Sequence, residues 1–164
     1  MDKTDVDRVC HRQVPSTSFA TEHAGSHYAF CSVQCRDRFL EHPHLYIGYP
    51  GSPAPAQQGR QVIKRHRLML SASLDVTQAE KVKRALYGMV GVQEVEIEEN
   101  RIEIQYDLII VTMEQIAEKI ESTGAHLGEG WLDRLKFALI NNLEEIEANS
   151  LEVEKPNGLH YPIR

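Results

Sequence analysis

The chain lacks the excess of basic residues that broad binding to nucleic acid or to an anionic membrane requires. Its 164 residues include 18 Lys and Arg against 24 Asp and Glu, which gives a formal net charge of −6 at pH 7. A surface that binds polyanions normally forms a basic stripe or patch. We therefore expect neither nucleic acid nor a membrane surface as a partner.

Long apolar runs are also missing. The N-terminal segment MDKTDVDRVCHRQ has no apolar core of the kind that a secretory signal peptide needs. No later stretch approaches the roughly 20 apolar residues of a membrane-spanning helix. These two absences favour a cytoplasmic protein without a membrane span.

Cysteine is scarce, and its three copies lie close to the N-terminus, at Cys10, Cys31 and Cys35. An odd number leaves one cysteine unpaired in any disulfide framework, and clustered cysteines in a reducing compartment are more often metal ligands or redox groups. A Cys31 nucleophile with a histidine base would need a third group to orient the base, and the sequence indicates none. We therefore do not expect an enzyme.

A segment rich in proline and glycine divides the chain. The residues YPGSPAPAQQGRQ at 49–61 have no apolar periodicity and are typical of a linker. We predict a metal-binding module at 1–48, a second domain at 62–128, and a C-terminal helix with its tail at 129–164. The predicted fold class is α+β, with two folded units in series.

The first unit is predicted to be treble-clef-like, with a short hairpin followed by a helix. The hairpin turns at Ala24-Gly25, and the helix in VQCRDRFLEHP begins after a Ser32 cap and ends before Pro43. A unit of about 50 residues buries too little apolar surface to be stable without a cross-link. A bound metal is the usual cross-link where disulfides are excluded.

The second unit shows strand and helix patterns in the order β-α-β-β-α. Its strands are VIKRHRLMLSA, GVQEVEIEEN and RIEIQYD, and its helices are VTQAEKVKRALYGM and VTMEQIAEKIESTG. A weak last strand at AHL would complete the βαββαβ order of a ferredoxin-like fold. Strand alternation predicts an apolar face toward the helices and a charged open face. The apolar face holds Val95, Ile97, Ile102 and Ile104, and the open face holds Glu94, Glu96, Glu98, Glu103, Gln105, Arg65 and Arg67.

The C-terminal stretch GWLDRLKFALINNLEEIEANS predicts an additional helix with a narrow apolar stripe. The sheet of the second unit already has two helices on one face, and its other face is charged. We therefore expect a second copy of the chain to bury the stripe in a homodimer. The alternative is that the helix folds back onto its own domain edge or onto the first unit. The stripe consists of Leu132, Leu135, Leu139, Leu143 and Ile146.

The cysteines follow the pattern C-x20-C-x3-C. Cys31 and Cys35 are about one helical turn apart and face the same side, so that a third cysteine from a separate loop can close a soft-metal site. Three thiolates suit Zn(II) with a fourth ligand, or trigonal Cu(I) without one. We expect one such ion per chain.

A longer pattern, G..Y.FCS..C...F...P..Y, surrounds the second and third cysteines and ends at Tyr46. Together with DRVC at 7–10, which is similar to a DPVC opening, it resembles the YHS/TRASH family of small metal-binding modules over residues 5–48. The resemblance implies copper or other heavy-metal handling, with Cys10, Cys31 and Cys35 as ligands. The family often continues CGM where this chain has Cys10-His11-Arg12. His11 is thus a candidate fourth ligand, although a single histidine is more often a surface or packing group.

The loop LDVTQAE connects the first strand and first helix of the second unit. This unit resembles the heavy-metal-associated domain of copper chaperones and P-type ATPases over about residues 63–127, but that family has C-x-x-C where this chain has Asp75 and Gln78. A carboxylate and an amide are poor Cu(I) ligands. The loop is more simply a helix N-cap, in which Asp75 or Thr77 accepts from free amides and Gln78 or Glu80 completes a capping box. We expect a degenerate relative that serves docking or dimerisation.

These patterns together predict a cytoplasmic protein of heavy-metal homeostasis that carries, buffers or senses copper or zinc through its thiolates. The expected partners are the metal ion and a heavy-metal transporter or regulator. A structural-zinc adaptor is the alternative, in which the metal only folds the first unit and function depends on protein contacts.

Overall fold

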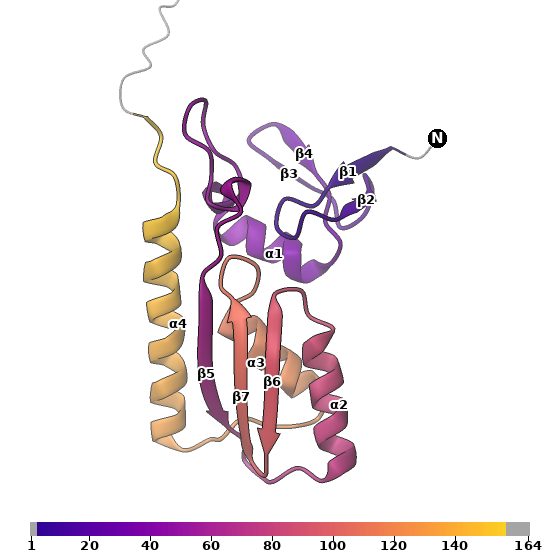
Figure 1. Cartoon of the computed structure of the whole chain (residues 1–164), viewed down its shortest axis with the longest axis vertical. Coiled ribbons are helices and arrows are strands. Elements are labelled where there is room, and N and C mark those ends of the chain that lie inside the picture. The colour runs from indigo at the N-terminus through magenta and orange to yellow at the C-terminus, as the bar shows by residue number, and fades with distance from the viewer. Residues whose placement is uncertain (1–2, 157–164) are drawn as a thin grey trace, which may run out of the picture.

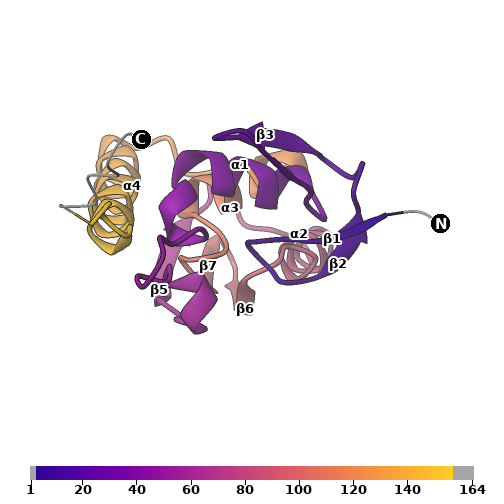
Figure 2. The same cartoon turned by 90° about the horizontal axis from the view of Figure 1, so that it is seen from above.

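The computed structural model describes residues 3–156, which form two units packed against each other (Figures 1 and 2). The first unit contains two short antiparallel hairpins followed by a helix and a single 3-10 turn. Its elements are β1 (Thr4–Val6), β2 (Gln13–Pro15), β3 (Thr21–His23), β4 (Ser26–Tyr28), α1 (Val33–Glu41) and η1 (Pro43–Leu45).

Local chemistry explains the predicted hairpin and helix, both of which are confirmed. Ala24 and Gly25 have φ values of 50° and 77°, and a two-residue type I′ turn requires positive φ at both positions. The Ser32 side chain accepts a hydrogen bond from the Cys35 amide and caps α1. The hairpin of β1 and β2, which holds Cys10 in its connecting loop, has no comparable turn signal and was not predicted.

The second unit is a three-stranded antiparallel sheet with helices on one face (Figure 1). The strand order β5-β7-β6 corresponds to the first, third and second strands of a ferredoxin-like fold. Apolar residues of β6 and β7 are buried toward the helices, as the alternation predicts. The elements are β5 (Ile63–Met69), α2 (Val76–Tyr87), β6 (Val92–Glu98), β7 (Arg101–Asp107) and α3 (Met113–Ser122).

The predicted last strand at AHL is wrong in extent. It is reduced to a single antiparallel bridge between Leu127 and Leu70, which follows β5 directly. The segment is short because it starts after Gly124, which has a φ of 92°, and ends at Gly128, whose amide donates to Met69 O. The bridge still lies at the edge of β5, where the fourth strand of this fold adds.

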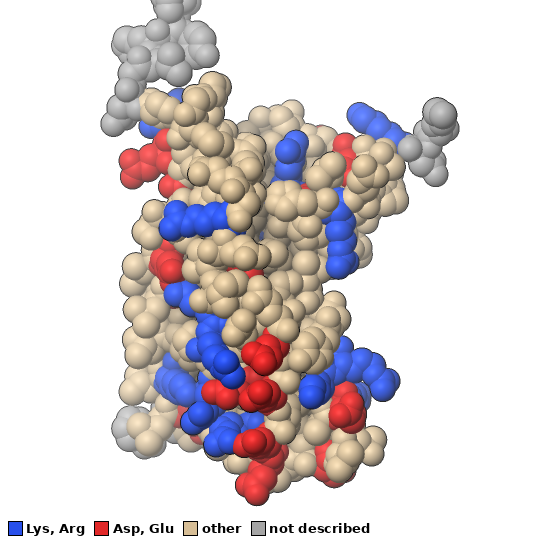
Figure 3. Space-filling model, in the orientation of Figure 1, with Lys and Arg blue, Asp and Glu red and all other residues tan. Residues whose placement is uncertain are grey.

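The open face of the sheet is charged, as predicted. Arg65 lies 3.8 Å from both Glu94 and Glu103, and Arg67 lies 3.4 Å from Glu103. Basic and acidic side chains alternate over this face in Figure 3. Exposed pairs of this kind contribute little to stability, but they keep the face polar.

Helix α4 (Trp131–Leu151) lies along the free edge of β5 (Figures 1 and 2). Ile140 and Ala148 are buried against the body, and the Glu144 carboxylate accepts from Tyr106 Oη–H and from the Met113 amide. The helix therefore folds back onto its own domain edge, as the alternative prediction stated. It does so through a different face from the apolar stripe, whose five residues remain between 54% and 62% exposed.

The two units share one interface, at the loop that follows β7. Ile109 of this loop packs in the core of the first unit with Phe39 and Tyr46. The Arg38 side chain is buried, donates to Leu108 O over 2.9 Å, and lies 3.4 Å from Glu41. The first unit thus completes its core with residues from the second.

The segment predicted as a linker is folded against the first unit. Ala54 and Ala56 are buried, and residues Ala56–Gln58 form a 3-10 turn, η2. The predicted boundaries of the units stay a prediction. Among the described residues, no helix is both long and apolar enough to cross a membrane.

Replacing Arg38 tests the interface between the units. We expect Arg38→Ala to lower the free energy of unfolding by about 2–4 kcal/mol, because it removes a buried side chain and leaves the Leu108 carbonyl without its donor. Arg36→Ala, at a side chain of the same helix that is 34% exposed, should change it by less than about 0.5 kcal/mol. Urea unfolding followed by circular dichroism measures both values. Equal effects of the two substitutions would contradict the role of Arg38.

Candidate metal centre

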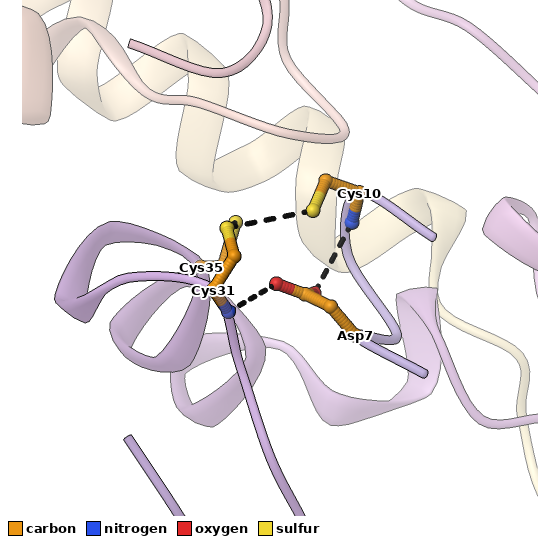
Figure 4. A group of neighbouring side chains, drawn as sticks. All are labelled: Asp7, Cys10, Cys31 and Cys35. Atoms are coloured by element: carbon orange, nitrogen blue, oxygen red, sulfur yellow. Dashed lines mark hydrogen bonds between the residues drawn. The ribbon is translucent and has the colours of Figure 1, made fainter. Parts of the chain in front are cut away.

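A turn between β1 and β2 positions the first cysteine. The Asp7 amide donates to Arg12 O, and the His11 amide donates to Asp7 O, at 2.9 and 2.8 Å. His11 has a positive φ of 62°. These contacts fold the loop back on itself, so that Cys10 points toward α1 (Figure 4).

The N-terminus of α1 supplies the other two cysteines. Cys31 lies directly before the cap residue, and Cys35 lies in the first helical turn. The Sγ atom of Cys31 is 3.5 Å from that of Cys10 and 3.6 Å from that of Cys35, and all three are free thiols. The structure therefore brings together the three cysteines that the sequence pattern predicted as ligands.

Asp7 is the fourth member of this cluster. One carboxylate oxygen of Asp7 and the Sγ atoms of the three cysteines all lie within 4.8 Å of one another. Asp7 is fully buried; its Oδ1 accepts from the Val9 and Cys10 amides at 2.8 and 3.2 Å, and its Oδ2 accepts from the Cys31 amide at 2.8 Å (Figure 4). The carboxylate thus joins the two segments that hold the cysteines.

Sequence reasoning missed this role of Asp7. A signal was present, because an Asp two or three residues before a cysteine can accept from the local backbone amides in an Asx-turn. The bond to the Cys31 amide, 24 residues away, could not be read from local pattern.

His11, the predicted fourth ligand, is exposed and is not among the clustered groups of the described residues. The hydrogen bond from its amide to Asp7 O fixes its backbone rather than its ring. Its contribution as a ligand stays a prediction.

The three thiols differ in how readily they lose a proton. A hydrogen bond with the Cys35 thiol lowers the pKa of Cys10 to about 7, although burial opposes this change. The same hydrogen bond, together with burial, raises the pKa of Cys35, and burial raises the pKa of Cys31. Cys10 is therefore the thiol that deprotonates first.

Asp7 stays ionised beside these thiols. Burial alone would raise the pKa of its carboxyl group, but hydrogen bonds from the Cys31 and Val9 amides outweigh burial and hold the pKa below its ordinary value. A buried carboxylate and a neighbouring thiolate together favour a cation between them.

The donor set fits a soft metal ion. Three sulfurs held 2.3 Å from a tetrahedral zinc ion are about 3.8 Å apart, close to the separations seen here. Cu(I) also prefers thiolates and needs no fourth ligand. The Asp7 oxygens already accept three amide hydrogen bonds, which makes this residue better suited to positioning the ligands than to replacing one.

The cluster is open on one side. Cys35 is buried, whereas Cys10 and Cys31 are partly exposed. Cys31 also lines a cleft of about 700 Å³ between α1, the end of α2 and α3. Carboxylates on the walls of this cleft belong to Asp37, Glu41, Glu114 and Glu118.

The loop before α2 is a helix cap, as predicted. Asp75 Oδ1 accepts from the Gln78 amide at 2.8 Å, and Gln78 Oε1 accepts from the Asp75 amide at 3.1 Å. Both side chains are thus engaged at the positions where the heavy-metal-associated family has its cysteines.

Comparisons with known proteins agree with the position of this cluster. The YHS domain family matches residues 6–49, a range that holds all four clustered residues. The comparison with curated proteins found no match.

Two solved structures are similar to part of the chain. The solution structure of a presumed copper-ion-binding protein from Bacillus anthracis str. Ames is 19% identical, covers 40% of this chain and 96% of its own, and has a TM-score of 0.39. The NMR solution structure of the ZiaAN sub mutant is 25% identical, covers 42% of this chain and 100% of its own, and has a TM-score of 0.37.

The family match and the geometry concern the same residues: a capped helix, a hairpin and three cysteines gathered around a buried aspartate. Residues 6–49 of this chain are a YHS domain.

Proposed function

We propose that the chain binds one soft metal ion, Cu(I) or Zn(II), through Cys10, Cys31 and Cys35, and carries, buffers or senses it in heavy-metal homeostasis in the cytoplasm. One observation carries the proposal: three free thiols from two separate segments lie with their sulfurs 3.5 and 3.6 Å apart in succession. Free thiols this close together are poised to bind a soft cation.

The exposure of the cluster supports exchange of the ion. A structural site is closed, whereas an ion that is passed on must be reached by an incoming ligand. Cys10 and Cys31 are partly exposed, and Cys31 faces the cleft. An incoming thiolate from another protein would approach along this cleft, and a transporter or regulator of heavy metals is the proposed partner.

Each residue of the site has a distinct part in binding. Cys10, with the lowered pKa, offers the first thiolate. Cys31 and Cys35 give up their protons when the ion binds, since a thiolate rather than a thiol is the ligand. The bound ion would supply a cross-link between the loop after β1 and the start of α1. We propose no catalytic role for any of them.

A structural-zinc adaptor is the second candidate, and the burial of Cys35 favours it. Its side chain is in the core of the first unit beside Phe30 and Phe39. An ion held there would mainly fasten α1 to that core, and function would depend on protein contacts.

Substituting the cysteines tests the ligand set. Each of Cys10→Ser, Cys31→Ser and Cys35→Ser should lose most of the bound metal, because serine is a poor ligand for a soft ion. The triple variant should bind no Cu(I) in competition with a thiol, since Asp75 and Gln78 are engaged in a cap. Metal content after purification under reducing conditions measures this. His11→Ala is the matched control and should keep its metal.

Three outcomes of these substitutions would contradict the proposed ligand set. Full metal retention in all three single variants would refute the thiolate site. Stoichiometric Cu(I) in the triple variant would mean that the second unit binds metal. Loss of metal in His11→Ala would make His11 a ligand.

Asp7→Asn separates a positioning residue from a ligand. Asparagine has only one side-chain oxygen, so it cannot accept both from the Val9 and Cys10 amides and from the Cys31 amide, as Asp7 does, and the cysteines should be held less well. Substituting a residue that orients the ligands without binding the metal typically lowers metal affinity by about 10- to 100-fold. We expect weaker binding with one ion per chain and an unchanged absorption spectrum of the Co(II)-substituted protein. A shift in the Co(II) ligand-field bands would instead show that Asp7 is a ligand.

Metal exchange distinguishes carriage from a structural role. We expect a chromophoric chelator to withdraw the ion within minutes while the near-ultraviolet circular dichroism of the protein stays the same. A structural ion would resist the chelator, and its eventual loss would be accompanied by loss of that signal. The latter result would favour the adaptor.

A further inference from the structure

Helix α4 has two apolar faces, and the body of the protein covers one of them. Ile140 and Ala148 are buried against the sheet edge and the first unit. The other face is the stripe of Leu132, Leu135, Leu139, Leu143 and Ile146, more than half exposed throughout. Five large apolar side chains in one row on a single helix are an unusual surface to leave in water.

The stripe is accessible along its whole length. Helix α4 forms the outer edge of the molecule in both views, with the body on one side only (Figures 1 and 2). In Figure 3 that edge shows a continuous surface without charged side chains along the middle of the helix. Nothing in the described part of the chain covers it.

The spacing of the stripe is the same from both ends. Successive members are three, four, four and three residues apart, so the row is symmetric about Leu139. When two identical helices pair antiparallel around a two-fold axis, residues equally far from the axis on opposite sides meet. With the axis at Leu139, every member of the stripe faces another member in the partner copy.

We propose that two copies of this chain associate through α4, antiparallel, with the two-fold axis at Leu139. Leu139 then meets the partner's Leu139, Leu135 meets the partner's Leu143, and Leu132 meets the partner's Ile146. The isologous contact uses the same patch on both copies and therefore closes as a dimer.

Charge supports the antiparallel direction. The first half of α4 carries Arg134 and Lys136 against Asp133, whereas the second half carries Glu144, Glu145 and Glu147. An antiparallel pair places the net positive half of one copy beside the net negative half of the other. A parallel pair would instead place the two acidic halves together, which disfavours that arrangement.

The dimer leaves both metal centres accessible. The strands β1 and β2, whose connecting loop holds Cys10, lie away from α4 in both views (Figures 1 and 2). None of the four clustered residues belongs to α4, so two copies joined through the stripe keep both thiolate clusters outside the contact. The assembly is independent of whether the clusters hold metal.

Sedimentation velocity from about 1 to about 100 µM tests the assembly, because a dimer dissociates on dilution. We expect the unaltered chain to be dimeric at the upper end and Leu139→Glu to be monomeric, since two glutamates would meet at the axis. Val76→Glu is the matched control: Val76 is 83% exposed on α2, away from the stripe, and this variant should dimerise normally. Circular dichroism checks that both variants are folded. A monomeric unaltered chain, or equal dissociation of the two variants, overturns the proposal.

Mixing two variants tests the direction of pairing. Leu135→Lys and Leu143→Glu should each be monomeric alone, because the new charge meets a leucine at both pairs. Mixed one to one, they should form a heterodimer, in which the lysine meets the glutamate at one pair and two leucines meet at the other. A parallel pair would join equivalent positions, so that each new charge would face a leucine after mixing and no lysine–glutamate pair would form. A mixture that stays monomeric therefore overturns the antiparallel register.

Discussion

The candidate metal centre depends on one buried carboxylate. Asp7 accepts from the amides of Val9, Cys10 and Cys31, and these bonds compensate for removing its charge from water. Together with the contact between the Cys10 and Cys31 thiols, they join the loop after β1 to the start of α1. Burial raises the pKa of Cys31, and the hydrogen bond with Cys10 together with burial raises the pKa of Cys35. The negative charge of Asp7 adds to both shifts, because it disfavours further thiolates nearby. A bound cation would offset these negative charges, so the arrangement of Asp7 and the three cysteines favours metal binding.

The second unit holds helix α1, whose first turn carries Cys35, in position. Gln34, in the same helical turn as Cys35, donates to Val90 O at 2.7 Å, and its carbonyl accepts from Gln115 at 3.0 Å. Arg38, one turn later, reaches Leu108 O. Helix α1 is thus fixed to the ferredoxin-like unit along one side while its N-terminus presents the cysteines. The ferredoxin-like unit thus contributes to the position of the cysteines, although Asp75 and Gln78 of this unit are engaged in a helix cap.

Sequence reasoning correctly predicted the features that depend on interactions between residues close together in the chain. The turn at Ala24-Gly25, the Ser32 cap and the Asp75 cap each involve residues within three positions of one another, so local pattern contains the information. Strand alternation likewise identified the charged face of the sheet. The contact of Asp7 with Cys31 and the insertion of Ile109 into the first unit join distant segments, and local pattern does not record them. Helix α4 was the mixed case, since its stripe was evident but its second, shorter apolar face was not.

The shared core bears on whether the ion can leave. A unit of about 50 residues alone would need a metal to remain folded. Here Ile109 and Ala148 enlarge the core of the YHS domain, and His42 lies between Glu145 and Glu152 of the C-terminal segment at 3.2 and 3.3 Å. Part of the stability that an isolated module would draw from its metal is therefore supplied by the rest of the chain. A fold that does not rely wholly on a metal ion can lose the ion without unfolding, and this favours the proposed carriage or buffering over a structural site.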